Sequence, residues 1–210
     1  KPAMKKIGIL GGTFNPIHHG HLILGQAAKE EFGLDEILVM PTKNPAYKKI
    51  SGGVSEKNRV DMINLAIRDF PYFKFSDIEL KREGTTYTVD TLRELTKQAT
   101  DCRYYFIMGA DSLYQIETWK DPGQIFTMAD ILVATRNDSR SALDAQIDYL
   151  EEKYDGKIYH LSSPSIEISS NDIRKRCSNG SSIHFFLPED VIDYIERNDL
   201  YGSTADRRKA

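Results

Sequence analysis

Three histidines and a pair of glycines stand within one short segment near the N-terminus, KKIGILGGTFNPIHHGH at residues 5–21 of this 210-residue chain. His18 and His21 are three residues apart, so on the first turn of a helix their imidazole rings point to the same side. Two imidazoles placed in this way can donate hydrogen bonds to one group of phosphate oxygens and stabilise charge that develops there. The spacing therefore predicts a phosphate site.

Other chemistries that use glycine and histidine clusters fit this segment poorly. It is not G-x-G-x-x-G followed by a distant acidic residue, and it is not the Walker loop G-x-x-x-x-G-K-[ST]. His18, His19 and His21 lack the H-E-x-x-H spacing of a zinc site, and the nearest cysteine is Cys102. No metal ligand is therefore expected here, and a loop that only caps and packs is the remaining alternative.

A strand and a helix must position these histidines. The apolar run at residues 7–10 suits a buried parallel strand, and Gly11-Gly12 allows a sharp turn close to a ligand. A helix is predicted from near Gly20 to a C-cap at Gly33, so the open N–H groups of its first turn face the glycine loop. The predicted apolar face of this helix consists of Leu24, Ala27, Ala28 and Phe32.

The string GGTFNPIHHGH at residues 11–21 resembles the HxGH signature of the nucleotidyltransferase superfamily, which also contains the class I aminoacyl-tRNA synthetases. The resemblance implies that His18 and His21 contact the phosphates of ATP and the transition state. It also implies that the preceding loop lines the nucleotide. The residues of that loop are Gly11, Gly12, Thr13, Phe14 and Asn15.

A second motif, ISSNDIR at residues 168–174, has the residue types of a helix start that binds an anion. Ser170 is expected to cap the helix and Asp172 to lie in its first turn. The segment resembles the family's I-S-S-T-x-I-R signature, with Asn171 in place of the threonine. The ATP-binding residues that the resemblance implies, mainly for the β- and γ-phosphates, are Ser169, Ser170, Ile173 and Arg174.

The segment TYTVDTL at residues 86–92 is a good helix start, with Thr86 or Thr88 as the expected N-cap and Asp90 in the first turn. It is similar to the T-Y-T-x-[DN]-T-L segment of the pyridine-nucleotide adenylyltransferases within the superfamily. The resemblance implies that Thr86 and Tyr87 contact the substituent of the acceptor's pyridine ring.

A third segment begins at Gly109, where a predicted strand runs into a helix with Asp111 as its expected N-cap. Burial preference alone would place the only tryptophan, Trp119, in the core. The spacing from Gly109 to Trp119 resembles the family's GADxLxxxxxW pattern, which implies that this ring stacks on the pyridine. The resemblance further assigns Gly109 and Asp111 to ATP, and Lys120 and Arg136 to the acceptor nucleotide.

The loop at residues 41–55 leaves the carboxyl end of a predicted strand and is rich in lysine, glycine and proline. In the family, a His-Lys pair of this loop meets the acceptor phosphate, and here the pair is Tyr47-Lys48. The resemblance therefore assigns Lys48 a catalytic contact with that phosphate, and it assigns Asn15 to the acceptor as well as to ATP. Arg59, in the first turns of the helix that follows, is expected to be a surface residue; the alternative is that it serves a partner, because the helix dipole disfavours a cation at this end.

Strands and helices alternate along the rest of the chain, which is typical of a doubly wound parallel sheet. We therefore predict a Rossmann-like α/β fold with flanking helices in a single domain at residues 4–202. Residues 1–3 are expected to be a remnant of expression before the native start at Met4, and residues 203–210 a flexible tail. The further strands are predicted at 37–40, 73–80, 103–108, 131–134 and 158–161, and the further helices at 55–69, 110–120, 141–154, 170–179 and 187–196.

Composition places limits on the partners. With 40% hydrophobic and 28% charged residues and no apolar run of about 20 residues, no membrane span is expected. A formal net charge of −3 argues against a general nucleic-acid binder, so a nucleotide must be held by local positive groups. Two distant cysteines, Cys102 and Cys177, and the lack of an apolar leader indicate a reducing, cytoplasmic setting.

Taken together, the motifs resemble the bacterial nicotinate mononucleotide adenylyltransferases of the superfamily over nearly the whole chain. The resemblance implies transfer of AMP from ATP to nicotinate mononucleotide, giving deamido-NAD and pyrophosphate, with Mg²⁺ arriving on ATP and held by its phosphates. Nicotinamide mononucleotide or phosphopantetheine as acceptor, a glycerol-phosphate cytidylyltransferase, a non-catalytic nucleotide sensor and a transfer-RNA-binding fragment are the alternatives. A homo-oligomer is left open.

Overall fold

The computed structural model describes residues 3–43, 54–135, 140–164 and 166–203. Three residues of the sequence analysis, Tyr47, Lys48 and Arg136, lie outside these ranges, so their predicted roles stay predictions. No helix within the described part is long and apolar enough to cross a membrane. Cys177 is buried and Cys102 is half-buried.

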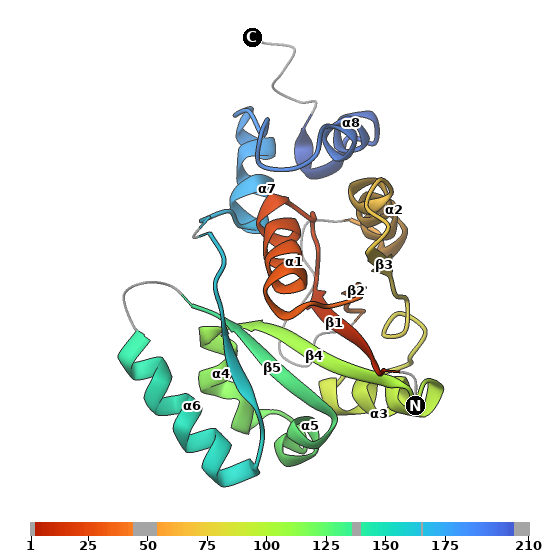
Figure 1. The fold of residues 1–210 in the computed structure, drawn as a ribbon. Coiled ribbons are helices and arrows are strands. Elements are labelled where there is room, and N and C mark those ends of the chain that lie inside the picture. The colour runs from red at the N-terminus through yellow and green to blue at the C-terminus, as the bar shows by residue number, and fades with distance from the viewer. Residues whose placement is uncertain (1–2, 44–53, 136–139, 165, 204–210) are drawn as a thin grey trace.

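One sheet of six parallel strands forms the centre of the molecule (Figure 1), in the order β3-β2-β1-β4-β5-β6. This order confirms the predicted doubly wound topology. The strand numbers fall from β3 to β1 and rise from β4 to β6, so the order of the strands reverses between β1 and β4. Ligands of such sheets bind outside the carboxyl ends of the strands at that reversal, which is where the loop after β1 begins. The strands are β1 (Lys5–Gly12), β2 (Glu36–Pro41), β3 (Phe73–Phe75), β4 (Cys102–Gly109), β5 (Ala129–Ala134) and β6 (Ile158–Leu161).

Helices cover both faces of this sheet, and successive strand residues pack alternately into two cores. Leu10 of β1 lies in the core that contains residues of α1, α2, α7 and α8, whereas Ile9 lies in the core that contains residues of α3, α4, α5 and α6. Gly8 is on the same face of β1 as Leu10, where a Cβ would stand 2.7 Å from Cδ1 of Ile37, so a side chain there would crowd this core. The helices are α1 (His19–Phe32), α2 (Glu56–Ile67), α3 (Thr88–Gln98), α4 (Ala110–Gln115), α5 (Pro122–Met128), α6 (Arg140–Tyr154), α7 (Ser170–Asn179) and α8 (Glu189–Arg197).

Several expected elements differ from the observed ones. β3 ends at Phe75, and the alternating Ile78 and Leu80 are buried in a turn instead of extending the strand. The helix predicted at 55–69 ends at Ile67, and Phe70 beyond it is 45% exposed. The short helix α5 was not predicted, because a proline and a glycine at its start read as a turn.

The C-terminal part packs on α7 and α8. After α8, a single 3₁₀ turn η2 (Leu200–Gly202) returns the chain toward α7. Ser203, placed with the tail in the sequence analysis, is 1% exposed, and its hydroxyl donates to the carbonyl of Ile195 at 3.2 Å. This residue therefore packs with the domain.

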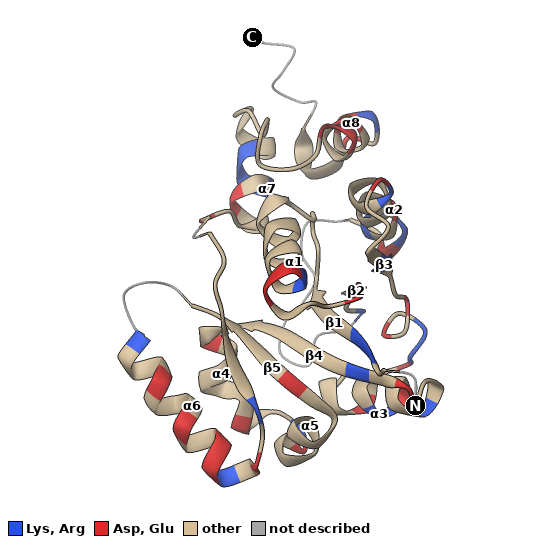
Figure 2. Cartoon of the chain, in the orientation of Figure 1, with Lys and Arg blue, Asp and Glu red and all other residues tan. Residues whose placement is uncertain are grey.

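Charge is unevenly distributed over the helices (Figure 2). Acidic residues line the outer surface of α6, while α7 carries three consecutive basic residues, Arg174, Lys175 and Arg176. Because α7 packs next to the N-terminal end of α1 (Figure 1), positive charge gathers locally near the histidine segment in a chain of net negative charge.

Candidate functional site

The loop from Gly12 to Pro16 leaves β1 at the carboxyl edge of the sheet and leads into α1. The backbone N–H of Thr42, which follows β2, donates to the carbonyl of Gly12 at 2.9 Å and ties the loop to the neighbouring strand end. Phe14 has a positive φ of 50°, and it is 1% exposed, so its side chain lies in the core. Asn15 is 2% exposed and precedes a cis peptide bond to Pro16.

The two histidines of the first motif form a stacked pair at the start of α1. His18 is the N-cap, and its Nδ1 accepts from the N–H of Gly20 at 3.0 Å. The Nδ1 of His21 accepts from the backbone N–H of His18 at 3.1 Å, and the ring centroids are 3.7 Å apart. An Nδ1 that accepts carries no proton, so each neutral ring presents an Nε2–H donor. The predicted common orientation of the two imidazoles is confirmed.

Burial keeps these rings neutral near pH 7. It lowers the pKa of His18 to about 4, with a smaller contribution from His19, and it lowers the pKa of His21 well below 6.5, with a contribution from His18. The edge of Phe14 supports His21 at a centroid distance of 4.8 Å. Without ligand the pair therefore offers two rigid N–H donors, and a bound anion would raise both pKa values.

The second motif lies against the first, although more than 150 residues separate them. The hydroxyl of Ser170 donates to the carbonyl of Pro16 at 2.8 Å, and Nη1 of Arg174 donates to the carbonyl of Asn15 at 2.8 Å. Tyr201, from η2, donates its hydroxyl to Oδ1 of Asn15. Both motifs thus form one site, with α7 fastened to the carbonyl side of the loop.

Two details of the second motif differ from expectation. Ser169, not Ser170, is the N-cap of α7, and its hydroxyl accepts from the N–H of Asp172. Ile173 is fully buried in the core, so only its backbone can line the nucleotide. Arg174 stays half-buried and, with Lys175, lines a cavity of about 490 Å³ beside η2, so its guanidinium remains reachable from solvent.

Arg59 is the residue of this region that the sequence analysis placed wrongly. Predicted at the surface, it is 2% exposed, and its Nη1 donates to the carbonyls of Thr13 at 2.9 Å and Thr42 at 2.8 Å. The only signal in the sequence is its place near the N-terminal end of α2, where the helix dipole disfavours a cation. Spacing on its own helix could not reveal partners that come from other loops.

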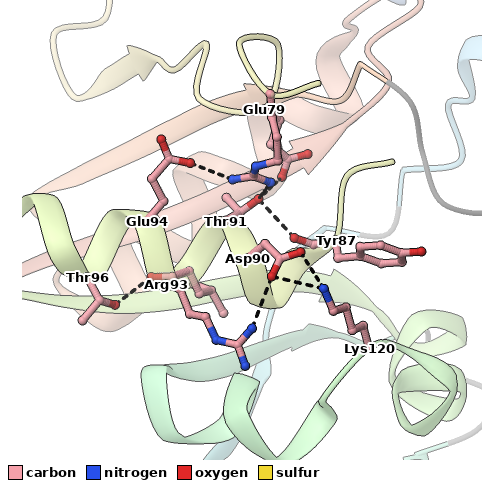
Figure 3. A network of polar contacts seen from close by, with 10 residues as sticks. Glu79, Tyr87, Asp90, Thr91, Arg93, Glu94, Thr96 and Lys120 are labelled. Atoms are coloured by element: carbon pink, nitrogen blue, oxygen red, sulfur yellow. Dashed lines mark hydrogen bonds and ion pairs between the residues drawn. The ribbon is translucent and has the colours of Figure 1, made fainter. Parts of the chain in front are cut away.

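Lys120 connects the segment at residues 86–92 with the segment that runs from Gly109 to Trp119 (Figure 3). Its Nζ lies 5.0 Å from the centroid of the Tyr87 ring and 3.1 Å from Oδ2 of Asp90. Thr86 is 7% exposed, and its hydroxyl is buried without a hydrogen-bond partner in the described part of the chain. Such an orphaned hydroxyl is unfavourable unless a ligand completes it. The structure therefore brings the segment at residues 86–92 close to the end of the segment from Gly109 to Trp119.

The N-caps of the two helices in this region differ from the predicted ones. Tyr87 is the N-cap of α3 and Gly109 that of α4, so the predicted caps at Thr86, Thr88 and Asp111 are wrong. Asp90 and Asp111 lie in the first turns of their helices, and Gly109 and Asp111 are exposed at the carboxyl end of β4.

Trp119 is half-buried. Its ring lies edge-on to that of Phe106, with the ring centroids 6.2 Å apart, so part of the Trp119 side chain stays open to a ligand.

A polar network supports the start of α3 from behind (Figure 3). The hydroxyl of Thr91 donates to Oε2 of Glu79 at 2.9 Å and accepts from Nη1 of Arg82 at 2.9 Å. Arg82 also pairs with Glu94 at 2.8 Å. Burial raises the pKa of Glu79 to about 7, although the Thr91 hydrogen bond and the Arg82 charge oppose this rise.

Stability is expected to fall as Glu79 ionises. Its pKa is near 4.5 when unfolded and about 7 when folded, so the protonated carboxyl favours the fold below pH 4.5, and this contribution is lost as pH rises to 7. Between pH 5 and 8, wild type should lose about 2–3 kcal/mol of unfolding free energy relative to Glu79→Gln. Urea titrations at several pH values measure this difference, with Glu83→Gln as the control for loss of an exposed carboxyl. A difference that does not change with pH would contradict the expectation.

Comparison with known proteins gives consistent matches. The sequence profile of the cytidylyltransferase-like family matches residues 9–176. A curated relative from Lachnoclostridium phytofermentans, named "Probable nicotinate-nucleotide adenylyltransferase", is 48% identical and covers 94% of this chain and 100% of its own length. A relative of the same name from Thermoanaerobacter sp. is 40% identical, covering 93% and 94%. The structure of Plasmodium falciparum nicotinic acid mononucleotide adenylyltransferase complexed with NaAD has a TM-score of 0.77 at 20% identity, covering 96% of this chain and 99% of its own, which establishes a shared fold.

Proposed function

We propose that this chain, which belongs to the cytidylyltransferase-like family and within it to the nicotinate-nucleotide adenylyltransferases, transfers AMP from ATP to nicotinate mononucleotide in NAD biosynthesis. The observation that carries this activity to the chain is the stacked His18–His21 pair, which offers two Nε2–H donors beside the loop after β1. The reaction gives deamido-NAD and pyrophosphate.

The transfer needs no nucleophile from the protein. An oxygen of the acceptor's 5′-phosphate forms a bond to the α-phosphorus of ATP, while the bond from that phosphorus to the bridging oxygen of the β-phosphate breaks and pyrophosphate leaves. Catalysis then consists of aligning the two substrates and stabilising the charge on the transferring phosphoryl group. Rigid donors serve this purpose because they need no reorganisation when the charge develops.

Each donor group has a place in this scheme. His18 and His21 donate to the phosphoryl oxygens of the transition state, and Arg174 with Ser169 and Ser170 binds the β- and γ-phosphates. Without ligand, Ser170 and Arg174 donate hydrogen bonds to carbonyls of the loop. When ATP binds, these donors either contact the carbonyls and the phosphate oxygens together or leave the carbonyls for the phosphate oxygens. Gly11, Gly12, Thr13, Asn15, Gly109 and Asp111 line the nucleotide.

The acceptor occupies the Thr86–Trp119 side of the site. The hydroxyl of Thr86, buried and without a hydrogen-bond partner in the described ranges, supports a polar contact with the substituent of the pyridine. The open part of Trp119 supports stacking on the ring. Lys120 adds positive charge beside Tyr87. Lys48 and Arg136 are proposed to bind the acceptor's phosphate and ribose side.

Mg²⁺ enters as part of the MgATP substrate. The described groups nearest the phosphate loop are N–H and guanidinium donors, which suit phosphate oxygens and repel a cation. We therefore assign the ion to the ATP phosphates, where it neutralises charge on the leaving pyrophosphate, and assign no protein ligand to it.

Pyrophosphate release tests the function. Purified protein with MgATP is compared on nicotinate mononucleotide, nicotinamide mononucleotide and phosphopantetheine at equal, subsaturating concentrations. We expect turnover with the nicotinate form to exceed that with the amide form by at least about tenfold, a difference near 1.4 kcal/mol. Equal rates with both pyridine nucleotides would remove the acid preference, and turnover with phosphopantetheine alone would overturn the proposal.

A further inference from the structure

Arg59 is the most buried charged side chain in the described part of the protein. It is 2% exposed, compared with 5% for Asp130 and 8% for Glu79. Asp130 is paired with Arg103, whereas the described hydrogen-bond partners of Arg59 are two backbone carbonyls, and the Glu56 carboxylate acts on it through its charge without an ion pair. Guanidinium stays protonated in proteins, so a full positive charge lies buried at this point.

The two carbonyls that Arg59 binds belong to the loops that leave two adjacent strands. Thr13 follows β1 and Thr42 follows β2, and the strands are in register from Ile7–Glu36 to Gly12–Pro41. A single nitrogen, Nη1, donates both hydrogen bonds, at 2.9 Å to Thr13 and 2.8 Å to Thr42, so it sets the separation of the loops. The first of these loops leads directly into the His18–His21 pair.

Fastening two loops together does not by itself require a charge. A buried cation loses its hydration, and uncharged groups that bridge the carbonyls would avoid that penalty. The Nε of Arg59 is also buried without a hydrogen-bond partner among the described residues, so the site does not satisfy the guanidinium fully. A buried charge does, however, act strongly on a nearby anion, because the protein interior screens it weakly.

We propose that Arg59 is a positioning residue for the reaction: it holds the Thr13 and Thr42 loops together and places a buried positive charge behind the loop that receives the ATP phosphates. This inference deepens the proposed function and rests on it. Arg59 need not touch the substrate. It acts through the loop backbone and through its field.

The test compares four variants of the full chain by calorimetric titration with MgATP in the absence of acceptor. Arg59→Met removes charge and donors, Arg59→Gln keeps an N–H donor without charge, and Arg59→Lys keeps the charge. Arg68→Met is the matched control. Arg68 lies just past the end of the same helix, is exposed and pairs with Asp190 of α8.

We expect the Kd for MgATP to rise at least tenfold in Arg59→Met, somewhat less in Arg59→Gln, and no more than about threefold in Arg59→Lys, with Arg68→Met unchanged. The melting temperature of each variant is measured alongside. Affinity that follows the melting temperature without regard to charge, or an Arg59→Gln affinity within twofold of wild type, would overturn the inference. If Arg59→Met does not fold, the Gln and Lys pair still decides it. Failure of wild type to bind MgATP would count instead against the proposed function.

Discussion

Replacing His18 with asparagine is expected to lower kcat for AMP transfer by about 10²–10³-fold, the loss typical of removing one preorganised donor from a charge-stabilising site. Asparagine is a good N-cap, so its side-chain oxygen can still accept from the N–H of Gly20. The variant therefore keeps the start of α1 while the Nε2–H donor disappears. The Kd for MgATP should change by less than about fivefold, because most ground-state contacts remain.

Single-turnover rates measured beside MgATP titrations separate these two effects. His19→Asn is the matched control, since His19 lies on the same turn but outside the stacked pair. We expect its kcat to stay within about twofold of wild type. An unchanged kcat in His18→Asn would contradict this role, and an unchanged kcat with weaker MgATP binding would show that the ring binds substrate without acting on the transition state.

Replacing Trp119 with alanine is expected to raise the KM for the acceptor by about 10–100-fold, because stacking of an aromatic side chain on a heterocycle contributes about 1–3 kcal/mol. The KM for MgATP should stay nearly constant, because the groups assigned to the ATP phosphates lie on the loop after β1, on α1 and on α7. Trp119→Phe keeps a ring and is expected to retain most of the affinity. Initial rates with each substrate varied in turn measure both constants.

Loss of Trp119 also removes its edge contact with Phe106, so the melting temperature is recorded for both variants. Tyr114→Ala is the control, because this aromatic side chain lies on α4 and is 42% exposed. An unchanged acceptor KM in Trp119→Ala would assign the tryptophan to packing alone. Equal increases in both KM values would point to a general distortion of the site.

The parts of the site that depend on neighbouring residues were predictable from the sequence. The strand at residues 7–10, the helix that ends at Gly33 and the common orientation of His18 and His21 all follow from patterns within one turn or one strand. The strand–helix alternation was sufficient for the doubly wound topology as well, because right-handed crossovers leave few other arrangements.

Cap positions were less predictable because several neighbouring residues can fill the same role. Ser169 and Ser170 both have a hydroxyl suited to an N-cap, and the choice between them depends on which hydroxyl the tertiary contact uses. In the structure Ser170 donates to Pro16, so Ser169 is left to cap α7. The start of the helix was predicted to within one residue, but the prediction of which serine caps it was wrong.

The amino-acid sequence by itself thus determined the motifs, the sheet and the facing pair of histidines, since these rest on short-range periodicity and spacing. The tertiary structure alone decided which distant groups hold the phosphate loop: Arg174, 159 residues from Asn15, and Arg59, 46 residues from Thr13. It also decided that Phe14 lies in the core and that the Thr86 hydroxyl is buried with no hydrogen-bond partner among the described residues. Such contacts depend on where the chain returns after crossing the sheet, and no local pattern of side chains records that return.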